Sequence, residues 1–246
     1  MHQPDLPLLN KTILITGAAR RIGRELALGA ARAGANILLH HAHSPGAAEE
    51  TAKRIQDLGR KVEILPCDFS NPPDVLHLVQ TAWNIRPFEI LVNSASIFSP
   101  LTVEDTSLED WQTHLNINLT APFLLSQSFA RLLPQDHVGR IINILDWRAL
   151  QPGADHLPYT ISKAALAALT RSLAISFAPR ITVNGLALGA ILPASDRSNP
   201  KAAAQVALIP RFATMDELVH AFLFLAAGTG YVTGEVLHLD GGRHLR

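Results

Sequence analysis

The chain has 246 residues, of which 48% are hydrophobic and 17% charged, so there is enough apolar material for a folded core and no compositional sign of disorder. Lys plus Arg and Asp plus Glu balance at 21 each, which removes any overall electrostatic basis for binding nucleic acid or an anionic membrane surface. Cys67 is the only cysteine, which excludes an intrachain disulfide and a thiolate metal cluster.

The first residues, Met1 to Asn10, contain neither the basic nor the apolar segment of a signal peptide. No later run approaches about 18 uninterrupted apolar residues, the length that a membrane-spanning helix needs. A single cysteine also suits a reducing compartment. We therefore expect a cytoplasmic protein with no membrane segment.

Apolar runs of strand length alternate with longer segments of helical period. The expected strands are Lys11–Thr16, Ala35–His40, Val62–Pro66, Glu89–Asn93, Arg140–Leu145, Ile181–Leu186 and Glu235–Leu239. The expected helices are Arg21–Ala33, Ala47–Leu58, Pro73–Trp83, Trp111–Leu133, Tyr159–Ala178 and Met215–Ala226.

This alternation predicts parallel strands joined by right-handed crossovers. We expect one α/β domain over residues 1–246, a Rossmann-type, doubly wound, seven-stranded parallel sheet with helices on both faces. Leu192–Pro210 lacks a clear period and is a candidate substrate loop.

The first expected strand runs directly into a glycine-containing turn, 16–23, and then a helix. Gly17 can make the tight bend, Gly23 permits close helix packing, and the backbone at Ile22 belongs to the helix start that faces a pyrophosphate. A glycine pair after a strand also occurs in purely structural turns, so the turn alone does not decide.

Side chains after the second expected strand favour NADPH. An NAD site usually has an acidic residue about 20 residues after the turn, and this chain has none there. It has instead several side chains that can donate to a 2′-phosphate: Arg20, Arg21, His40, His41, His43 and Ser44. His41 and Ser44 are the strongest of these candidates. The alternative is a solvated histidine loop or a fortuitous metal site; we expect no metal.

Tyr159 and Lys163 are four apart at the start of an apolar helix and project from the same face. A free phenol has a pKa of about 10, and a nearby ammonium would lower it toward neutrality, so Tyr159 could exchange protons. Two ordinary surface residues at this spacing are the alternative.

In their order along the chain, these motifs resemble the short-chain dehydrogenase/reductase family. The resemblance implies that Asp68 contacts adenine, that Lys163 also binds the nicotinamide ribose, and that Asn118 holds a water in a proton relay. It further implies cofactor contacts from a strand end and from the segment beginning at Val183: Asn93, Ala95, Ser96 and Gly189.

Three departures from the family pattern are informative. Arg21 stands in place of the middle glycine of the turn, Asp146 stands where most relatives carry serine, and Leu188 replaces a customary proline. The first two, together with the histidine-rich loop and Phe98, resemble pteridine reductases, and the tail from Asp240 resembles that of bacterial dihydromonapterin reductases. Leu188 has no explanation in the sequence.

A carboxyl at position 146 suits a C=N bond better than C=O. It can bond an amino-pyrimidine edge and help deliver a proton to a ring nitrogen, sharing that work with Tyr159. Phe98 is expected to stack on the ring, with Arg21 and Ser96 at its edge. Core packing for Phe98 and a turn or cap role for Asp146 are the alternatives.

The expected partners are a pterin-like small molecule and further copies of the chain. The resemblance implies a homotetramer in which the helices over 111–133 and 159–178 pair, and a tail in which Arg243 or Arg246 completes a neighbour's pocket; a frayed terminus is the alternative. A reductase of ketoacyl or sugar carbonyls, and a nucleotide sensor without turnover, remain competing functions. An enoyl-thioester reductase fits less well, because such relatives have a wider Tyr–Lys spacing.

Overall fold

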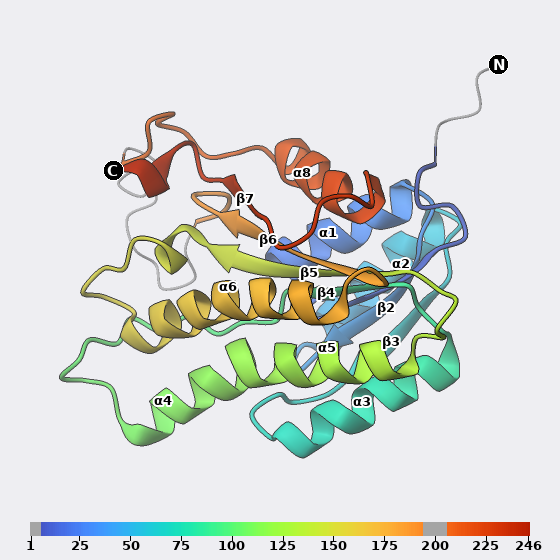
Figure 1. The fold of residues 1–246 in the computed structure, drawn as a ribbon, viewed down its shortest axis with the longest axis horizontal. Helices are drawn as coiled ribbons and strands as arrows, with labels where there is room; N and C mark the ends of the chain where they lie inside the picture. Colours follow the sequence, from blue (N-terminus) through green and yellow to red (C-terminus); the bar gives the residue numbers. More distant parts are fainter. Residues whose placement is uncertain (1–5, 194–205) are drawn as a thin grey trace.

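The computed structural model describes residues 6–193 and 206–246, which form one seven-stranded parallel sheet in the order β3-β2-β1-β4-β5-β6-β7 (Figure 1). The strands are β1 (Thr12–Ile15), β2 (Asn36–His41), β3 (Val62–Pro66), β4 (Ile90–Asn93), β5 (Gly139–Asp146), β6 (Ile181–Leu188) and β7 (Val236–Leu239). All six pairings between neighbours are parallel. The predicted α/β fold class is confirmed.

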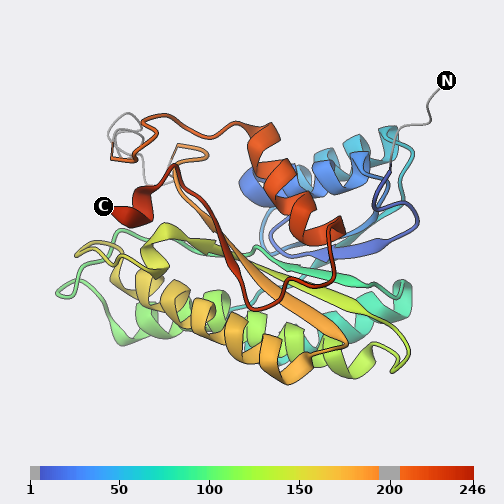
Figure 2. The same ribbon diagram turned by 45° about the horizontal axis from the view of Figure 1, so that its top comes forward.

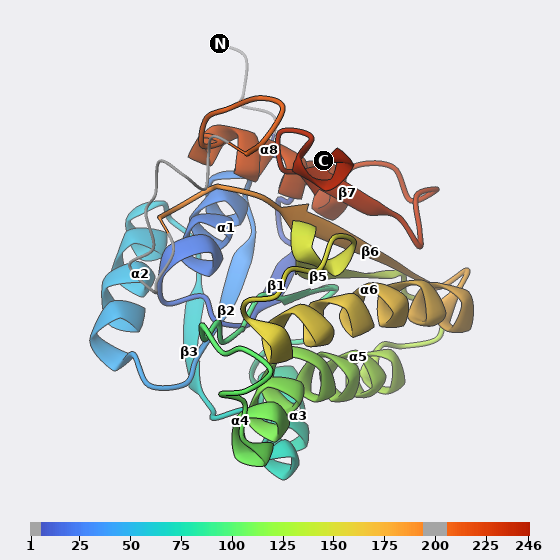
Figure 3. The same ribbon diagram turned by 90° about the vertical axis from the view of Figure 1, so that its left-hand side faces the viewer.

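Helices cover both faces of the sheet, as Figure 3 shows. They are α1 (Arg21–Arg32), α2 (Pro45–Asp57), α3 (Pro72–Ile85), α4 (Leu108–Leu115), α5 (Ala121–Leu132), α6 (Leu157–Phe177) and α8 (Met215–Ala227). Helices α1, α2 and α8 pack in one core, and α3, α5 and α6 pack in another.

Alternating side chains of the central strands supply both cores. On β1, Ile13 and Ile15 belong to the α1 side and Leu14 to the α3 side, and all three are fully buried. Because successive side chains of a strand point to opposite faces, a strand covered on both sides must be apolar throughout. This explains the uninterrupted apolar runs of the sequence.

The helix expected over 111–133 begins earlier and is not continuous. Ser107 and Asp110 form a capping box, so α4 starts at Leu108. Five residues of π-helix, η1 (Asn116–Thr120), then separate α4 from α5. A π-turn inserted in a helix commonly marks a functional position.

Strands β5 and β6 run further than expected at their carboxyl ends. Strand β5 continues to Asp146 and β6 to Leu188, and the two residues are register partners. These ends, with those of β1 and β4, meet at one edge of the sheet, where parallel folds place ligands. Asp146 is therefore presented at that edge by a strand and not by a loop.

Strand β7 lies at the sheet edge, between α8 and α6 in Figure 2. It leads into the C-terminal turn η3 (Arg243–Leu245). Most of the expected substrate loop, 194–205, lies outside the described residues. Within the described part of the chain, none of the helices combines the length and apolar character needed to cross a bilayer.

Candidate active site

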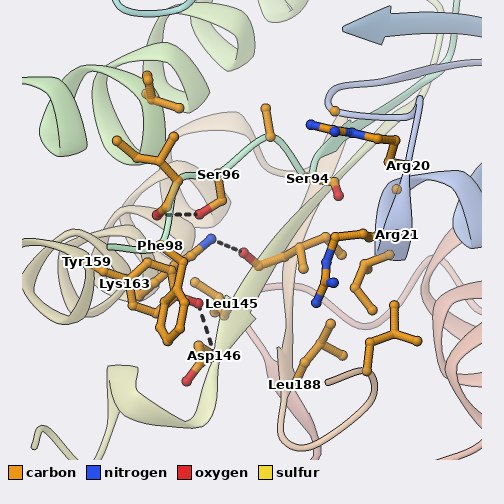
Figure 4. A pocket seen from close by; sticks show the side chains of 18 of the residues that line it. Arg20, Arg21, Ser94, Ser96, Phe98, Leu145, Asp146, Tyr159, Lys163 and Leu188 are labelled. Carbon is orange, nitrogen blue, oxygen red and sulfur yellow. Dashed lines mark hydrogen bonds between the residues drawn. The ribbon is translucent and has the colours of Figure 1, made fainter. Parts of the chain in front are cut away.

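A cavity of about 790 Å³ opens at the carboxyl edge of the sheet and extends from the phosphate turn to the C-terminal turn. Its wall includes most of the predicted site residues, brought together from the ends of β1, β2, β4, β5 and β6. Figure 4 shows the side chains around its centre, with Tyr159 and Asp146 directed toward one another. The cavity therefore joins a possible dinucleotide site to a possible substrate site.

The turn between β1 and α1 has the shape that a diphosphate requires. Gly17 has φ +65°, and a Cβ there would lie 2.9 Å from the Cα of Ala95. A Cβ on Gly23 would overlap the carbonyl oxygen of Gly17. Thr16 Oγ1 accepts hydrogen bonds from the amides of Ser94 and Ala95, both 2.9 Å, which joins the turn to the end of β4.

The start of α1 is open to an anion. Its N-cap, Arg20, makes no side-chain capping bond, and its first turn has no acidic residue. Arg20, Arg21 and Ile22 all line the cavity there. Exposed amide groups and the positive end of the helix dipole favour a phosphate at such a place.

Arg21 has φ +52°, a left-handed conformation that glycine adopts without steric cost. A glycine would therefore fit this place with less backbone strain than the arginine. The Arg21 side chain donates a 2.6 Å hydrogen bond to the carbonyl of Pro193 and spans the cavity mouth. Arg21 thus adopts a backbone conformation that is unfavourable for a residue with a side chain, and it places a cationic group at the cavity.

The expected 2′-phosphate residues lie where β2 ends and α2 begins. Ser44 is the N-cap of α2 and makes no side-chain capping bond, and its amide donates to Nδ1 of buried His41 at 3.4 Å. His43 is exposed and pairs with Asp68 at 3.0 Å. Hydrogen bonding from the Ser70 amide lowers the pKa of Asp68. His41, His43, Ser44 and Asp68 all line the cavity.

His40 does not fit the expectation that it donates to a 2′-phosphate. The Gly17 amide donates to its Nδ1 at 3.0 Å, so Nε2 carries the proton and donates to the carbonyl of Cys67 at 2.9 Å. The ring is 1% exposed and stacks on Phe69 at 4.2 Å. Burial lowers the pKa of His40 to about 4. This neutral histidine ties the phosphate turn to β3, which corrects the prediction.

Asp146 and Tyr159 form a hydrogen-bonded pair, with the phenol donating to Oδ2 of the carboxyl at 3.0 Å. Burial raises the pKa of Asp146. Burial, and then the negative charge of Asp146, raise the pKa of Tyr159 well above its ordinary value. Compared with free side chains, both groups of the pair are therefore shifted toward their protonated forms.

Lys163 does not lower the pKa of Tyr159 in this arrangement. Its Nζ donates to the carbonyl of Ile144 at 2.8 Å and lies 5.7 Å from the centre of the Tyr159 ring. Burial lowers the pKa of Lys163 itself to about 8. The expected lowering of the Tyr159 pKa is wrong for this arrangement, because burial, and then the neighbouring Asp146 carboxyl, raise it.

Two asparagines occupy structural positions. Asn93 donates to the side chain of Asn143 at 2.8 Å inside the sheet, and the expected cofactor contact at Asn93 stays a prediction. Asn118 is fully buried in η1, accepts from the amide of Ile97 and donates to the Ile97 carbonyl and to Ser162. Its side chain positions the segment before Phe98, and a contact with a relay water stays a prediction.

Phe98 lines the cavity, but one of its faces is already covered. His156, which the sequence did not single out, stacks on it at 3.8 Å, and Tyr159 meets it edge-on at 4.6 Å. His156 is buried, has φ +54° and pairs with Asp155 at 3.0 Å. In the sequence, the only indication that His156 belongs to the site is its position three residues before Tyr159.

The remaining predicted residues lie on the cavity wall. Ser96 is exposed there, and Leu188 is buried on another part of the wall, at the end of β6. A Cβ on Gly189 would lie 2.6 Å from the Cα of Asp240, so the glycine lets the C-terminal segment pass close to the cavity. Within the described residues, no group of three or more His, Cys, Asp or Glu side chains is placed to hold a metal ion.

The C-terminal turn reaches the pocket of its own chain. The guanidinium carbon of Arg243 lies 3.9 Å from the centre of the Trp147 ring, and both residues line the cavity. Arg246 is exposed and donates weakly to the carbonyl of Val206 at 3.4 Å. Arg243 thus lies at the pocket of its own chain, and the contribution of Arg243 or Arg246 to a neighbour's pocket stays a prediction.

Residues 17–244 match a family model described as "Enoyl-(Acyl carrier protein) reductase". A short-chain type dehydrogenase/reductase of Picea abies is 33% identical over 95% of this chain and 92% of its own length. The chain belongs to the short-chain dehydrogenase/reductase family.

Among members of this family, a 3-oxoacyl-[acyl-carrier-protein] reductase of Aquifex aeolicus, FabG, is 31% identical over 97% of this chain and 99% of its own. A solved structure, FolM alternative dihydrofolate reductase 1 from Brucella canis complexed with NADP, has a TM-score of 0.88 at 33% identity. That similarity covers 96% of this short-chain dehydrogenase/reductase and 95% of the solved chain.

Proposed function

We propose that this short-chain dehydrogenase/reductase is an NADPH-dependent reductase of dihydropterins. The observation that supports this most directly is the hydrogen-bonded Asp146–Tyr159 pair at the end of β5. The similarity to an alternative dihydrofolate reductase solved with NADP supports both the cofactor and the substrate class.

The residues at the phosphate turn and at the start of α2 fit a dinucleotide with a 2′-phosphate. Gly17 and Gly23 leave room for a diphosphate in the phosphate turn. The N-terminal ends of α1 and α2, with the basic side chains near them, favour the negative charges of the dinucleotide. The holding residues are Gly17, Arg20, Arg21, Ile22, Gly23, His41, His43, Ser44, Asp68, Ala95, Ser96, Tyr159, Lys163 and Gly189. When bound there, NADPH supplies a hydride to the carbon of the substrate C=N bond.

The chain's own residues supply the matching proton. Reduction of C=N adds one proton to nitrogen, and a protonated carboxyl is a far stronger acid for that step than a phenol with a raised pKa. Asp146 can also bond the amino-pyrimidine edge of a pterin through its second oxygen. The hydrogen bond from Tyr159 stabilises the Asp146 carboxylate that is left after transfer, and a proton from bulk water restores the acid before the next turnover.

The second candidate is a reductase of ketoacyl or sugar carbonyls, favoured by the similarity to 3-oxoacyl-[acyl-carrier-protein] reductases. In that reaction Tyr159 would protonate the alkoxide oxygen alone. The direct contact of Tyr159 with a carboxyl, which opposes phenolate formation, argues for the pterin reaction. A nucleotide sensor would not require this proton-holding pair.

Asp146→Ser separates the two candidates. NADPH oxidation is measured with dihydropterins, dihydrofolate and simple ketones, using the parent chain, Asp146→Ser, and Asp136→Ser as an exposed-carboxyl control. We expect kcat/KM for dihydropterin to fall about 100-fold or more in Asp146→Ser only, the scale of a lost general acid. Turnover of ketones alone, undiminished by the substitution, would assign the chain to the carbonyl reductases.

The proposal includes a homotetramer in the cytoplasm. Apolar side chains on the outer faces of α5 and α6, namely Phe123, Ile161 and Ile175, are exposed in the single chain and support pairing of these helices. Patches of this kind on a water-soluble protein are commonly covered by another subunit.

A further inference from the structure

His156 has an unfavourable backbone conformation immediately before the helix that carries Tyr159. It is the N-cap of α6, with φ +54° and ψ 42°, and its side chain makes no capping bond to the helix. A left-handed conformation costs free energy for a residue with a Cβ, and it persists where the surrounding contacts compensate. The His156 side chain is only 5% exposed, so the compensating contacts lie inside the protein.

The His156 ring packs Phe98 against the phenol of Tyr159. The rings of His156 and Phe98 are nearly parallel, at 13°, with their centres 3.8 Å apart. The rings of Phe98 and Tyr159 are almost perpendicular, at 83°, with their centres 4.6 Å apart (Figure 4). Stacked and perpendicular arrangements are both favourable for aromatic rings. Phe98 therefore links the orientation of His156 to that of Tyr159.

Hydrogen bonds connect His156 to the other end of the Asp146–Tyr159 pair. His156 Nδ1 lies 3.0 Å from Oδ2 of Asp155, and the Arg148 guanidinium donates to both oxygens of that carboxylate at 2.6 and 2.9 Å. The Arg148 amide donates to Oδ1 of Asp146 at 2.9 Å, and Oδ2 of Asp146 accepts from Tyr159. The contacts thus form a closed ring of six residues, namely Asp146, Arg148, Asp155, His156, Phe98 and Tyr159.

We propose that His156 is a positioning residue, which acts through Phe98 to fix the direction of the Tyr159 hydroxyl. A hydroxyl turned away from Asp146 would not stabilise its carboxylate in dihydropterin reduction, and in carbonyl reduction it would not reach the alkoxide oxygen. Small displacements of reacting groups have large effects on rate. The inference goes beyond the proposed function, because it holds for either candidate reaction.

Three variants isolate the stacked ring. His156→Asn removes it with little disturbance of the backbone, because asparagine adopts positive φ more readily than most residues and is favoured at N-caps. His156→Phe restores a ring on Phe98 without the histidine nitrogens. His137→Asn is the matched control, since His137 also follows an aspartate and lies 3.0 Å from it, but has a 56% exposed side chain outside the cavity lining.

NADPH oxidation at saturating substrate measures kcat for each variant with the dihydropterin and ketone panel, and titration measures the Kd for NADPH. We expect kcat to fall at least about 10-fold in His156→Asn, to stay within about threefold of the parent in His156→Phe, and to be unchanged in His137→Asn. The Kd for NADPH should change by less than about twofold throughout. An unchanged kcat in His156→Asn overturns the proposal. An equal loss in His156→Phe also overturns it, because a polar contact would then matter and not the ring.

A double-variant cycle tests the path through Phe98. In a Phe98→Leu background, His156→Asn should change kcat by less than about twofold, because the ring that carries the effect is already absent. A loss as large as in the parent background overturns the path. Phe98→Leu alone removes the same stacked contact without altering residue 156, so it also serves if His156→Asn does not fold. Its kcat should fall at least about 10-fold, and a parent-like kcat overturns the proposal.

The substrate panel separates this inference from the proposed function. A fall in kcat toward ketones in His156→Asn, in a chain without dihydropterin turnover, would overturn the proposed function and support the positioning role. Dihydropterin turnover that is undiminished in His156→Asn would do the reverse. A parent chain that turns over neither class of substrate would overturn both.

Discussion

The contact between Asp146 and Tyr159 shows how one substitution can change the chemistry of a family site. A serine at position 146 would leave the phenol next to a neutral hydroxyl, whereas the carboxyl raises the pKa of Tyr159 and accepts its hydrogen bond. The Tyr159 hydroxyl donates to the carboxyl, so neither group stands alone. The two must be treated as one titrating unit.

His40 is the residue whose protonation should most affect stability. Its pKa is lowered to about 4 in the folded chain, against 6.5 for an ordinary histidine. Because the unfolded chain binds this proton more readily, the contribution is fully present above pH 6.5 and is lost as pH falls toward 4. The shift corresponds to a free energy on the order of 3 kcal/mol.

We therefore expect the free energy of unfolding to fall steeply between pH 6.5 and 4 in the parent chain, and less steeply in His40→Gln, which cannot titrate. Urea denaturation at several pH values measures both slopes. His43→Gln is the control, since His43 is exposed and should leave the parent slope nearly unchanged. Parallel curves for the parent and His40→Gln would contradict the assignment.

Among the helices, Gly23 in α1 and Gly46 in α2 differ in how much space a side chain would have. A methyl group on Gly23 would overlap the Gly17 carbonyl, so the start of α1 would have to move away from β1. Gly46, in the first turn of α2, has nothing within 4 Å of the position that a Cβ would take.

Gly23→Ala should lower the free energy of unfolding by about 1–3 kcal/mol, the usual cost of overpacking, and weaken NADPH binding. Gly46→Ala should instead raise it by up to about 1 kcal/mol through helix propensity. Urea denaturation and NADPH titration of both variants test this pair. If both variants had the same free energy of unfolding and the same affinity for NADPH, the turn around Gly23 would accommodate a methyl group without the expected cost.

The sequence predicted the elements well where the periodicity is local. Strand β3 has the expected limits. The start of α4 was expected three residues too late, although Ser107 stands three residues before Asp110, the spacing of a capping box. The π-turn η1 was not predictable, because it accompanies contacts of Asn118 with Ile97 and Ser162 that are distant in the sequence. Such a turn has no residue signature of its own.

The candidate site was predictable as a set of residues but not in its contacts. The motifs identified Asp146, Tyr159 and Lys163, and all three line the cavity. Burial is a property of the folded chain, so the sequence could not show that His40 is enclosed or that Tyr159 has a raised pKa. His156 was missed because a histidine just before a helix is commonly a surface residue, and its stacking on Phe98 depends on a contact that is distant in the sequence.

For the whole molecule, the position of Arg243 predicts that each subunit completes its own substrate site. Co-expression of Asp146→Ser with Arg243→Met subunits gives mixed assemblies in which no chain carries both side chains. We expect no recovery of activity toward dihydropterins, because the two residues line the same cavity of one chain. Assemblies of each variant alone provide the baselines.

Recovered kcat/KM in the mixed assemblies would show instead that Arg243 serves a neighbour's site. The ratio of the two subunits can be set with distinguishable tags, and only assemblies containing both would regain the site. A dependence of recovery on that ratio would contradict the arrangement within one chain.

The anchoring of the last residues by Asp240, which accepts hydrogen bonds from the amides of Gly242 and His244, also determines how the protein should be handled. Leu8, near the first described residue, donates to the carbonyl of Ala33 at the end of α1, at the opposite edge of the sheet from the cavity. Any affinity tag appended after Arg246 would emerge beside Arg243 and Trp147 and compete with substrate for space. A tag preceding Leu8 would leave the pocket untouched, so weak activity of a C-terminally tagged preparation would reflect the fusion and not the enzyme.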